Sequence, residues 1–261
     1  MTKGQKIRDV LFPFVYAILI LLVSEMIVLL IAGLAGGYAD PDEITAKMRF
    51  VPLLSSAGFY ICSLIFMRRM FLSDEARFGR DHNGWPLWKA AAAVITSAAA
   101  GDAVSCLIGG SGISQIFQGY SAAFTASFDG QNVILLVAVT CVLGPVAEEV
   151  IFRGIIFRRA RAYLGPVGGA LVSALLFGLY HANVVQFIYA AAAGMLFALW
   201  YHESGSLKIC AAAHAAMNLW AVLLSRGFGI SSLDPATWSP ALPVAEGIVA
   251  AAGIFCILRK K

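Results

Sequence analysis

Long apolar stretches alternate with short polar segments along the whole chain. Eight of these stretches are about as long as the roughly 20 apolar residues that cross the hydrocarbon layer of a bilayer, so they predict transmembrane helices. They lie at about 11–35, 51–67, 88–110, 131–158, 166–184, 185–201, 207–225 and 241–258. Only His181, Ala182 and Asn183 separate the fifth stretch from the sixth, so a seven-helix alternative stays open there.

The basic residues follow the predicted topology. With eight spans and a cytoplasmic N-terminus, 16 of the 19 Lys and Arg residues fall in cytoplasmic segments, which is the bias that short inside loops show. Only Lys47, Arg49 and Arg226 fall on the other side. We therefore expect an even number of spans, with both termini in the cytoplasm.

The composition agrees with this pattern. Hydrophobic residues make up 60% of the chain and charged residues only 13%, whereas about a quarter of a soluble domain is charged. We predict an all-α fold, a polytopic integral membrane helical bundle in which residues 1–261 form a single transmembrane domain surrounded by membrane lipid. The net charge of +4 reflects topology and does not indicate a nucleic-acid partner.

Several ionisable residues lie inside the predicted spans, where a charge at the bilayer centre costs about 2.5 to 3.5 kcal/mol. They are Glu25, Asp102, Glu148, Glu149, Glu246, His181 and His214. We expect Glu25 and Asp102 to hydrogen-bond across helices or to line a cavity, and Glu246 to lie near the membrane interface. The other four carry the candidate chemistry.

The fourth span contains two adjacent acids in the run GPVAEEVIFRG. Glu149 and Arg153 are four residues apart, the spacing of a helical ion pair. Glu148 points about 100° away and has no basic residue on its own face within one turn. A carboxylate without a charged partner in a low-dielectric site has the tuning of a general base. Pro145 frees the carbonyl of Cys141, so a kink above the acids is predicted.

Two further spans place polar side chains at helical spacing. Phe177 and His181 lie one turn apart on the fifth span, and His214 and Asn218 lie one turn apart on the seventh. With a rise of 1.5 Å per residue, Glu148, His214 and Asn218 lie roughly 10 to 16 Å above the inner helix ends, and His181 roughly 20 Å or more. The four could still meet around one cavity that opens inward.

The three motifs E-E-x-x-x-R, F-x-x-x-H and H-x-x-x-N, in this order, resemble the CAAX protease and bacteriocin-processing family, which includes the Ras-converting type II CAAX prenyl endopeptidase. The resemblance covers about residues 140 to 220, and it places the catalytic core at about 131–226. It implies an intramembrane endopeptidase in which Glu148 and His181 activate a water and His214 and Asn218 form the oxyanion site. Glu149, Arg153 and Phe177 have supporting roles.

The resemblance implies a peptide or lipidated protein as substrate and a multi-pass protein of a bacterial or archaeal plasma membrane. We expect no cofactor, because H-E-x-x-H is absent. Zinc bound by Glu148, His181 and His214 is the alternative. Two other functions stay open. A proton-coupled transporter could use the same acids and histidines, and a non-catalytic immunity or scaffold protein would not need them.

Overall fold

The computed structural model describes residues 1–35, 51–79, 84–111, 131–226 and 241–259, and all regular structure in these ranges is helical. The first helices are α1 (Lys3–Ala35), α3 (Val51–Phe78) and α4 (Leu87–Gly110). One helical run then comprises α7 (Val133–Val137), η1 (Ala138–Leu143), α8 (Gly144–Glu149), η2 (Val150–Phe157) and α9 (Arg158–Tyr180). The last helices are α10 (Val184–Ser204), α11 (Leu207–Ser225) and α12 (Ala241–Leu258). The predicted all-α, multi-pass membrane fold is confirmed.

The number of spans is six or seven by length and apolar composition within the described residues, where the sequence predicted about eight. The seventh is α3, whose two parts are bent by 47° between Phe66 and Arg68. The difference arises because the predicted fourth and fifth spans form one helical run of 48 residues, Val133–Tyr180. Gly165 interrupts this run with φ 73°, and the stretch after it is shorter than the roughly 20 residues of a full span.

The division between the predicted fifth and sixth spans is now clear. Helix α9 ends at Tyr180 and α10 begins at Val184. The side chain of Asn183 caps α10, accepting hydrogen bonds from the backbone N–H groups of Val185 (2.9 Å) and Gln186 (3.2 Å). A capping side chain satisfies donors that have no partner inside the helix, so the polar break predicted at residues 181–183 does separate two helices.

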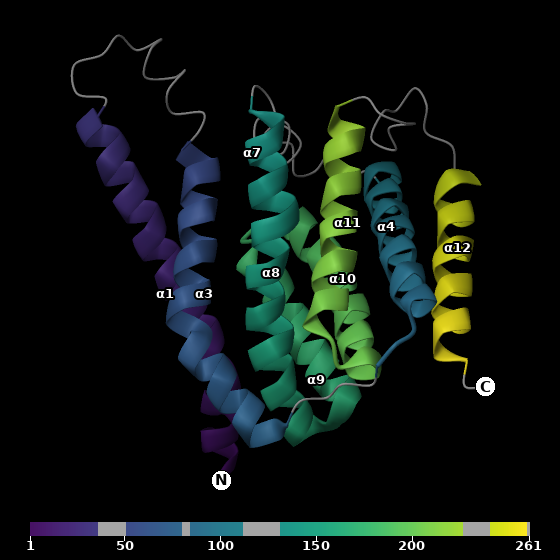
Figure 1. Ribbon diagram of the computed structural model, residues 1–261, viewed down its shortest axis with the longest axis horizontal. Coiled ribbons are helices and arrows are strands. Elements are labelled where there is room, and N and C mark those ends of the chain that lie inside the picture. Colours follow the sequence, from purple (N-terminus) through teal and green to yellow (C-terminus); the bar gives the residue numbers. More distant parts are fainter. Residues whose placement is uncertain (36–50, 80–83, 112–130, 227–240, 260–261) are drawn as a thin grey trace.

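The helices form a row in which α1 and α3 lie side by side at one edge and α12 lies at the other edge, against α4 (Figure 1). Helices α8 and α11 lie between them, and α9 packs on α10. The start of α1 and the end of α12 are on the same side of the bundle (Figure 1). That both termini lie in the cytoplasm stays a prediction.

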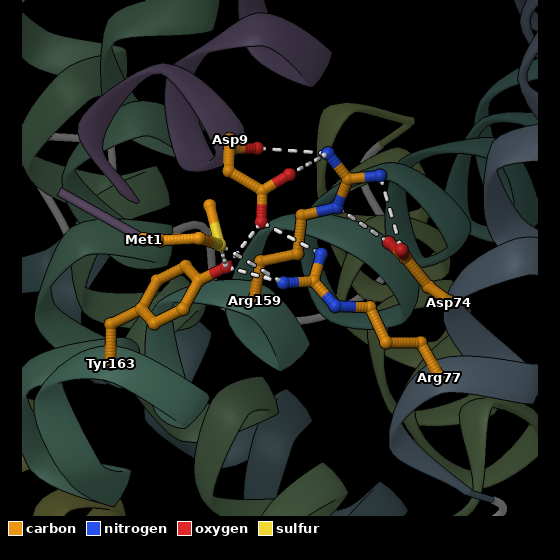
Figure 2. A network of polar contacts seen from close by, with 6 residues as sticks. All are labelled: Met1, Asp9, Asp74, Arg77, Arg159 and Tyr163. Atoms are coloured by element: carbon orange, nitrogen blue, oxygen red, sulfur yellow. Dashed lines mark hydrogen bonds and ion pairs between the residues drawn. The ribbon is translucent and has the colours of Figure 1, made fainter. Parts of the chain in front are cut away.

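A polar network, which we call the clasp, joins the start of α1, the end of α3 and α9 (Figure 2). Its side chains belong to Met1, Asp9, Asp74, Arg77, Arg159 and Tyr163. Arg159 binds Asp74 through Nε (2.7 Å) and Nη2 (3.1 Å) and reaches Asp9 Oδ1 with Nη1 (3.2 Å). Arg77 donates to Asp9 Oδ2 (2.9 Å) and to the Tyr163 hydroxyl (2.6 Å). Because a two-point Arg–carboxylate pair fixes geometry, the clasp holds α1 and α3 against α9.

Candidate active site

The two adjacent glutamates lie between two wide helical turns. Residues Ala138–Leu143 and Val150–Phe157 adopt π-helical geometry, with Glu148 and Glu149 on the short α8 between them. Such π segments are frequent at functional sites because they change the phase of the side chains that follow. The helix irregularity predicted from Pro145 is therefore present, and it has a different form from a simple kink.

The wide turn changes which carbonyl loses its donor. The Gly144 N–H donates to Val139 O, five residues back, and in this register Pro145 stands opposite Thr140 O. Proline has no N–H to donate. The amide of Asn218 takes that place, since its Nδ2 donates to Thr140 O at 2.8 Å. Asn218 thereby ties α11 to the irregular turn, a contact that the sequence did not indicate.

Glu149 and Arg153 form the predicted ion pair, with 3.1 Å between Arg153 Nη1 and Glu149 Oε1. Arg153 is completely buried. Its Nη2 donates to Gly194 O on α10 at 3.1 Å, and its guanidinium lies over the rings of Phe177 (4.7 Å) and Phe197 (5.2 Å). The cation is therefore held by a carboxylate, a carbonyl and two aromatic faces.

His214 lies between the two glutamates. Its Nδ1 is 2.9 Å from Glu149 Oε1, and its Nε2 is 3.6 Å from Glu148 Oε2. The ring of Phe197 stacks on the imidazole with 4.8 Å between centroids. All three residues are at most 5% exposed. Glu149 thus belongs to the site more directly than its predicted supporting role implied, because it orients the imidazole as well as pairing with Arg153.

Within the described part of the chain, the polar partners of Glu148 come from other helices. Besides His214, the hydroxyl of Tyr60 on α3 donates to Glu148 Oε1 at 3.1 Å. The sequence correctly placed no basic residue on the same helical face, but it did not indicate these contacts. Tyr60 is 88 residues away from Glu148 and belongs to none of the motifs, so no sequence signal pointed to it.

His181 lies at the end of α9, partly buried, beside the same aromatic side chain as His214. The ring of Phe177 is 5.0 Å from the imidazole of His181 and 5.7 Å from that of His214. His181 Nδ1 is 2.8 Å from Phe177 O. Because a carbonyl only accepts, this contact assigns the proton to Nδ1 and leaves Nε2 as the acceptor of a neutral imidazole. Phe177 therefore aligns His181 through its backbone and both histidines through its ring.

Both histidines have features of zinc ligands. Each has an oxygen at Nδ1, which is the usual arrangement for a histidine that binds zinc through its other nitrogen. Although Glu148 Oε2 and His214 Nε2 are 3.6 Å apart, the ligand atoms of Glu148, His181 and His214 do not all lie within 4.8 Å of one another. In the described part of the chain, only Asp102, Cys106 and Glu246 meet this criterion for three residues. The three residues of the zinc alternative are thus not gathered as a ligand set.

The remaining acids in the spans lie elsewhere. Asp102 accepts a hydrogen bond from Trp220 Nε1 at 3.0 Å, so it does link two helices, as expected. Glu246 Oε2 lies 3.8 Å from Cys106 Sγ on α4, and its position near the membrane interface stays a prediction. Glu25 is exposed on α1.

Comparison with known proteins agrees with the motifs. Residues 130–220 match the family model described as "Type II CAAX prenyl endopeptidase Rce1-like". The Bacillus subtilis (strain 168) protein named "Putative membrane peptidase YdiL" is 32% identical over 94 residues, which cover 36% of this chain and 38% of that protein. The chain thus matches less than half of this relative's length. No solved structure matches the chain.

The matched segment contains the two glutamates, both candidate histidines and Asn218. It also contains Arg153 and Phe177, which hold them in place. The resemblance that the three motifs indicated is therefore confirmed. Over residues 130–220, this multi-pass membrane protein is similar to the CAAX protease and bacteriocin-processing family, through its Rce1-like, type II CAAX prenyl endopeptidase model.

Proposed function

We propose that this protein is an intramembrane endopeptidase that cleaves a membrane-associated or lipidated peptide with a water activated by glutamate and histidine. One observation carries the proposal: His214 contacts two buried carboxylates, Glu149 and Glu148, inside the segment that matches the endopeptidase family. Buried charges of this kind are expensive in a membrane protein and usually have a function.

In the proposed reaction, Glu148 is the general base and His181 assists it. Glu148 Oε2 takes a proton from the water, the hydroxide attacks the scissile carbonyl carbon, and the proton is later given to the leaving amine. The lone pair on His181 Nε2 orients the water. The support for this assignment is the contact of His181 Nδ1 with Phe177 O, which places a proton on Nδ1 and directs Nε2 away from that carbonyl.

His214 and Asn218 are the proposed donors to the oxyanion. For His214 to donate to the oxyanion while its Nδ1–H binds Glu149 Oε1, both ring nitrogens must carry a proton. Its Nε2–H, which lies 3.6 Å from Glu148 Oε2, is then the donor for an oxyanion that forms beside Glu148. The second N–H of Asn218 is the other donor, because the first is directed to Thr140 O. Removing one such donor typically lowers the rate by about 100- to 1,000-fold.

The proposed substrate class is a prenylated protein C-terminus or a similar membrane peptide, in a bacterial or archaeal plasma membrane. The family description and the peptidase name of the Bacillus subtilis relative support this class. We propose that no metal takes part, because Glu148, His181 and His214 are not gathered as a ligand set.

The experiment is a cleavage assay with the purified full chain in lipid vesicles. The substrates are a farnesylated peptide with a CAAX-type C-terminus and the same peptide without the lipid, and products are measured by mass spectrometry. Glu148→Gln should lower kcat by at least about 100-fold, the usual contribution of a general base. Glu25→Gln is the matched control, because it removes an exposed carboxylate from another span, and it should leave kcat within twofold.

Two results would contradict the proposed function. The first is a wild-type protein that cleaves neither peptide, combined with unchanged membrane peptides in cells that carry Glu148→Ala. The second is a Glu148→Gln variant that cleaves as fast as the wild type. A proton-coupled transporter would instead give a proton flux that depends on Glu148, which a pH-sensitive dye inside the same vesicles would report.

A further inference from the structure

Tyr60 reaches the candidate base from outside the family segment. It lies on α3, whereas the matched segment begins at residue 130. Its hydroxyl donates to Glu148 Oε1 at 3.1 Å. The other oxygen, Oε2, is the one that faces His214 Nε2 at 3.6 Å. The two carboxylate oxygens thus have different neighbours, one a phenol and the other the imidazole.

The approach of Tyr60 depends on a missing side chain. A Cβ added at Gly144 would lie 3.0 Å from Tyr60 Cζ and 3.2 Å from its hydroxyl oxygen, distances that very few real Cβ contacts show. Gly144 precedes Glu148 by about one turn and is buried on the same helix, α8. A glycine at this point therefore opens the space through which the phenol reaches the carboxylate.

The phenol is held from both sides. The ring of Tyr60 lies against that of Phe59, with 5.3 Å between centroids, and Phe59 in turn stacks on the ring of Tyr180 with 5.6 Å between centroids. The ring of Tyr180 is in turn 5.1 Å from the imidazole of His181. Through Phe59, the two tyrosines thus connect the carboxylate of Glu148 with the surroundings of His181.

The clasp holds the helix that carries Tyr60. Asp74 and Arg77 are on the last turns of α3 and bind Arg159 and Asp9, which places the far end of α3 against α9 and α1 (Figure 2). Arg159 lies only two residues beyond Phe157, the last residue of η2. Helix α3 therefore contacts the helical run Val133–Tyr180 at two points: Tyr60 binds Glu148, and Asp74 binds Arg159.

We propose that Tyr60 is a positioning residue of the active site, whose hydroxyl fixes Oε1 of Glu148 so that Oε2 is directed to the water and to His214. This inference rests on the proposed function. Tyr60 keeps its own proton throughout, and the proton of the water goes to Oε2. A hydrogen bond to an ionised acceptor is among the strong ones, so the hydroxyl stabilises both the ionised carboxylate and its orientation.

The test is Tyr60→Phe, which removes the hydroxyl and keeps the ring that packs on Phe59. In the vesicle assay we expect kcat to fall about 10- to 100-fold, the range for loss of a hydrogen bond to a charged group, with KM within twofold. The acidic limb of the pH–rate profile should move to higher pH, because the ionised form of the base has lost a donor. A structural role alone would not move this limb.

Tyr16→Phe is the matched control, because it removes a hydroxyl from a ring that stacks on Phe12 of α1, 6.0 Å away. It should change neither kcat nor the profile. If Tyr60→Phe keeps at least half of the wild-type kcat and an unshifted profile while Glu148→Gln is inactive, the inference is wrong and the proposed function stands. If Glu148→Gln is fully active, or the wild type cleaves nothing, the proposed function fails and the inference fails with it.

Discussion

Arg153 is expected to be the most sensitive position of the candidate site for stability. Replacing it by Met keeps much of the volume and removes the cation. Glu149, 1% exposed, then loses its partner at 3.1 Å, and Gly194 O loses its donor. Removing one member of a buried ion pair costs about 3 to 5 kcal/mol, because the remaining charge is left uncompensated.

A second variant separates the cost of the uncompensated charge from the cost of lost packing. Arg153→Met combined with Glu149→Gln removes both charges, and replacing a whole buried pair often costs little. We therefore expect the double variant to be more stable than Arg153→Met by about 1 to 3 kcal/mol. Its stability should still be below that of the wild type, because the amide replaces the carboxylate that contacts His214 Nδ1 at 2.9 Å.

The assay is thermal unfolding of the purified proteins in one detergent, with reversible urea or guanidinium unfolding where it is available. A loss of about 3 kcal/mol should lower Tm by roughly 6 to 12 °C for a chain of this size. The reasoning would be refuted by an Arg153→Met variant within about 1 °C of the wild type. A double variant that is less stable than Arg153→Met would refute it equally, because the loss would then come from packing and not from an uncompensated charge.

Three further outcomes are expected. Gly194→Ala should lower Tm by several degrees, because the new Cβ would lie 2.9 Å from Ala174 Cα. Gly247→Ala on α12 is the control and should leave Tm unchanged, because no atom lies within 4 Å of its added Cβ. Equal Tm values for the two variants would contradict the close packing of α9 on α10. Asp74→Asn should destabilise the protein by about 1 to 3 kcal/mol, because buried Arg159 loses a charged acceptor. An unchanged unfolding midpoint would show that the clasp contributes nothing to the free energy of unfolding. Strong chelators should leave peptide cleavage within twofold of the untreated protein, and activity that is lost with chelator and restored by zinc would contradict water activation without a metal.

Local features of the sequence were sufficient for the membrane fold. Apolar length is a property of each segment alone, so most helices were predicted where the structure has them, including the polar break before Val184, although two predicted spans form the single run Val133–Tyr180. Pairs one turn apart were also predictable. Glu149 with Arg153, and Phe177 with His181, meet because the helix repeat places such residues on one face.

Irregular backbone was harder to predict. The depth estimate, which placed His181 above the other candidates, assumed straight helices with a constant rise, and the backbone here is not regular. Gly165 interrupts the run with φ 73°, and two π-helical segments alter the phase on both sides of the glutamates. Pro145 indicated an irregularity, but which carbonyl it would leave free depends on the hydrogen-bond register that the packed helix adopts.

Only the tertiary structure decided which side chains from different helices meet. Glu148 acquires Tyr60 and His214 as partners, at sequence separations of 88 and 66 residues (148 − 60 and 214 − 148). Such contacts depend on the rotation and depth of each helix in the bundle, and small residues such as Gly144 and Gly194 set how closely the helices approach. The sequence by itself determined a helical membrane protein with acids and histidines in its spans, and packing determined which of them share one site.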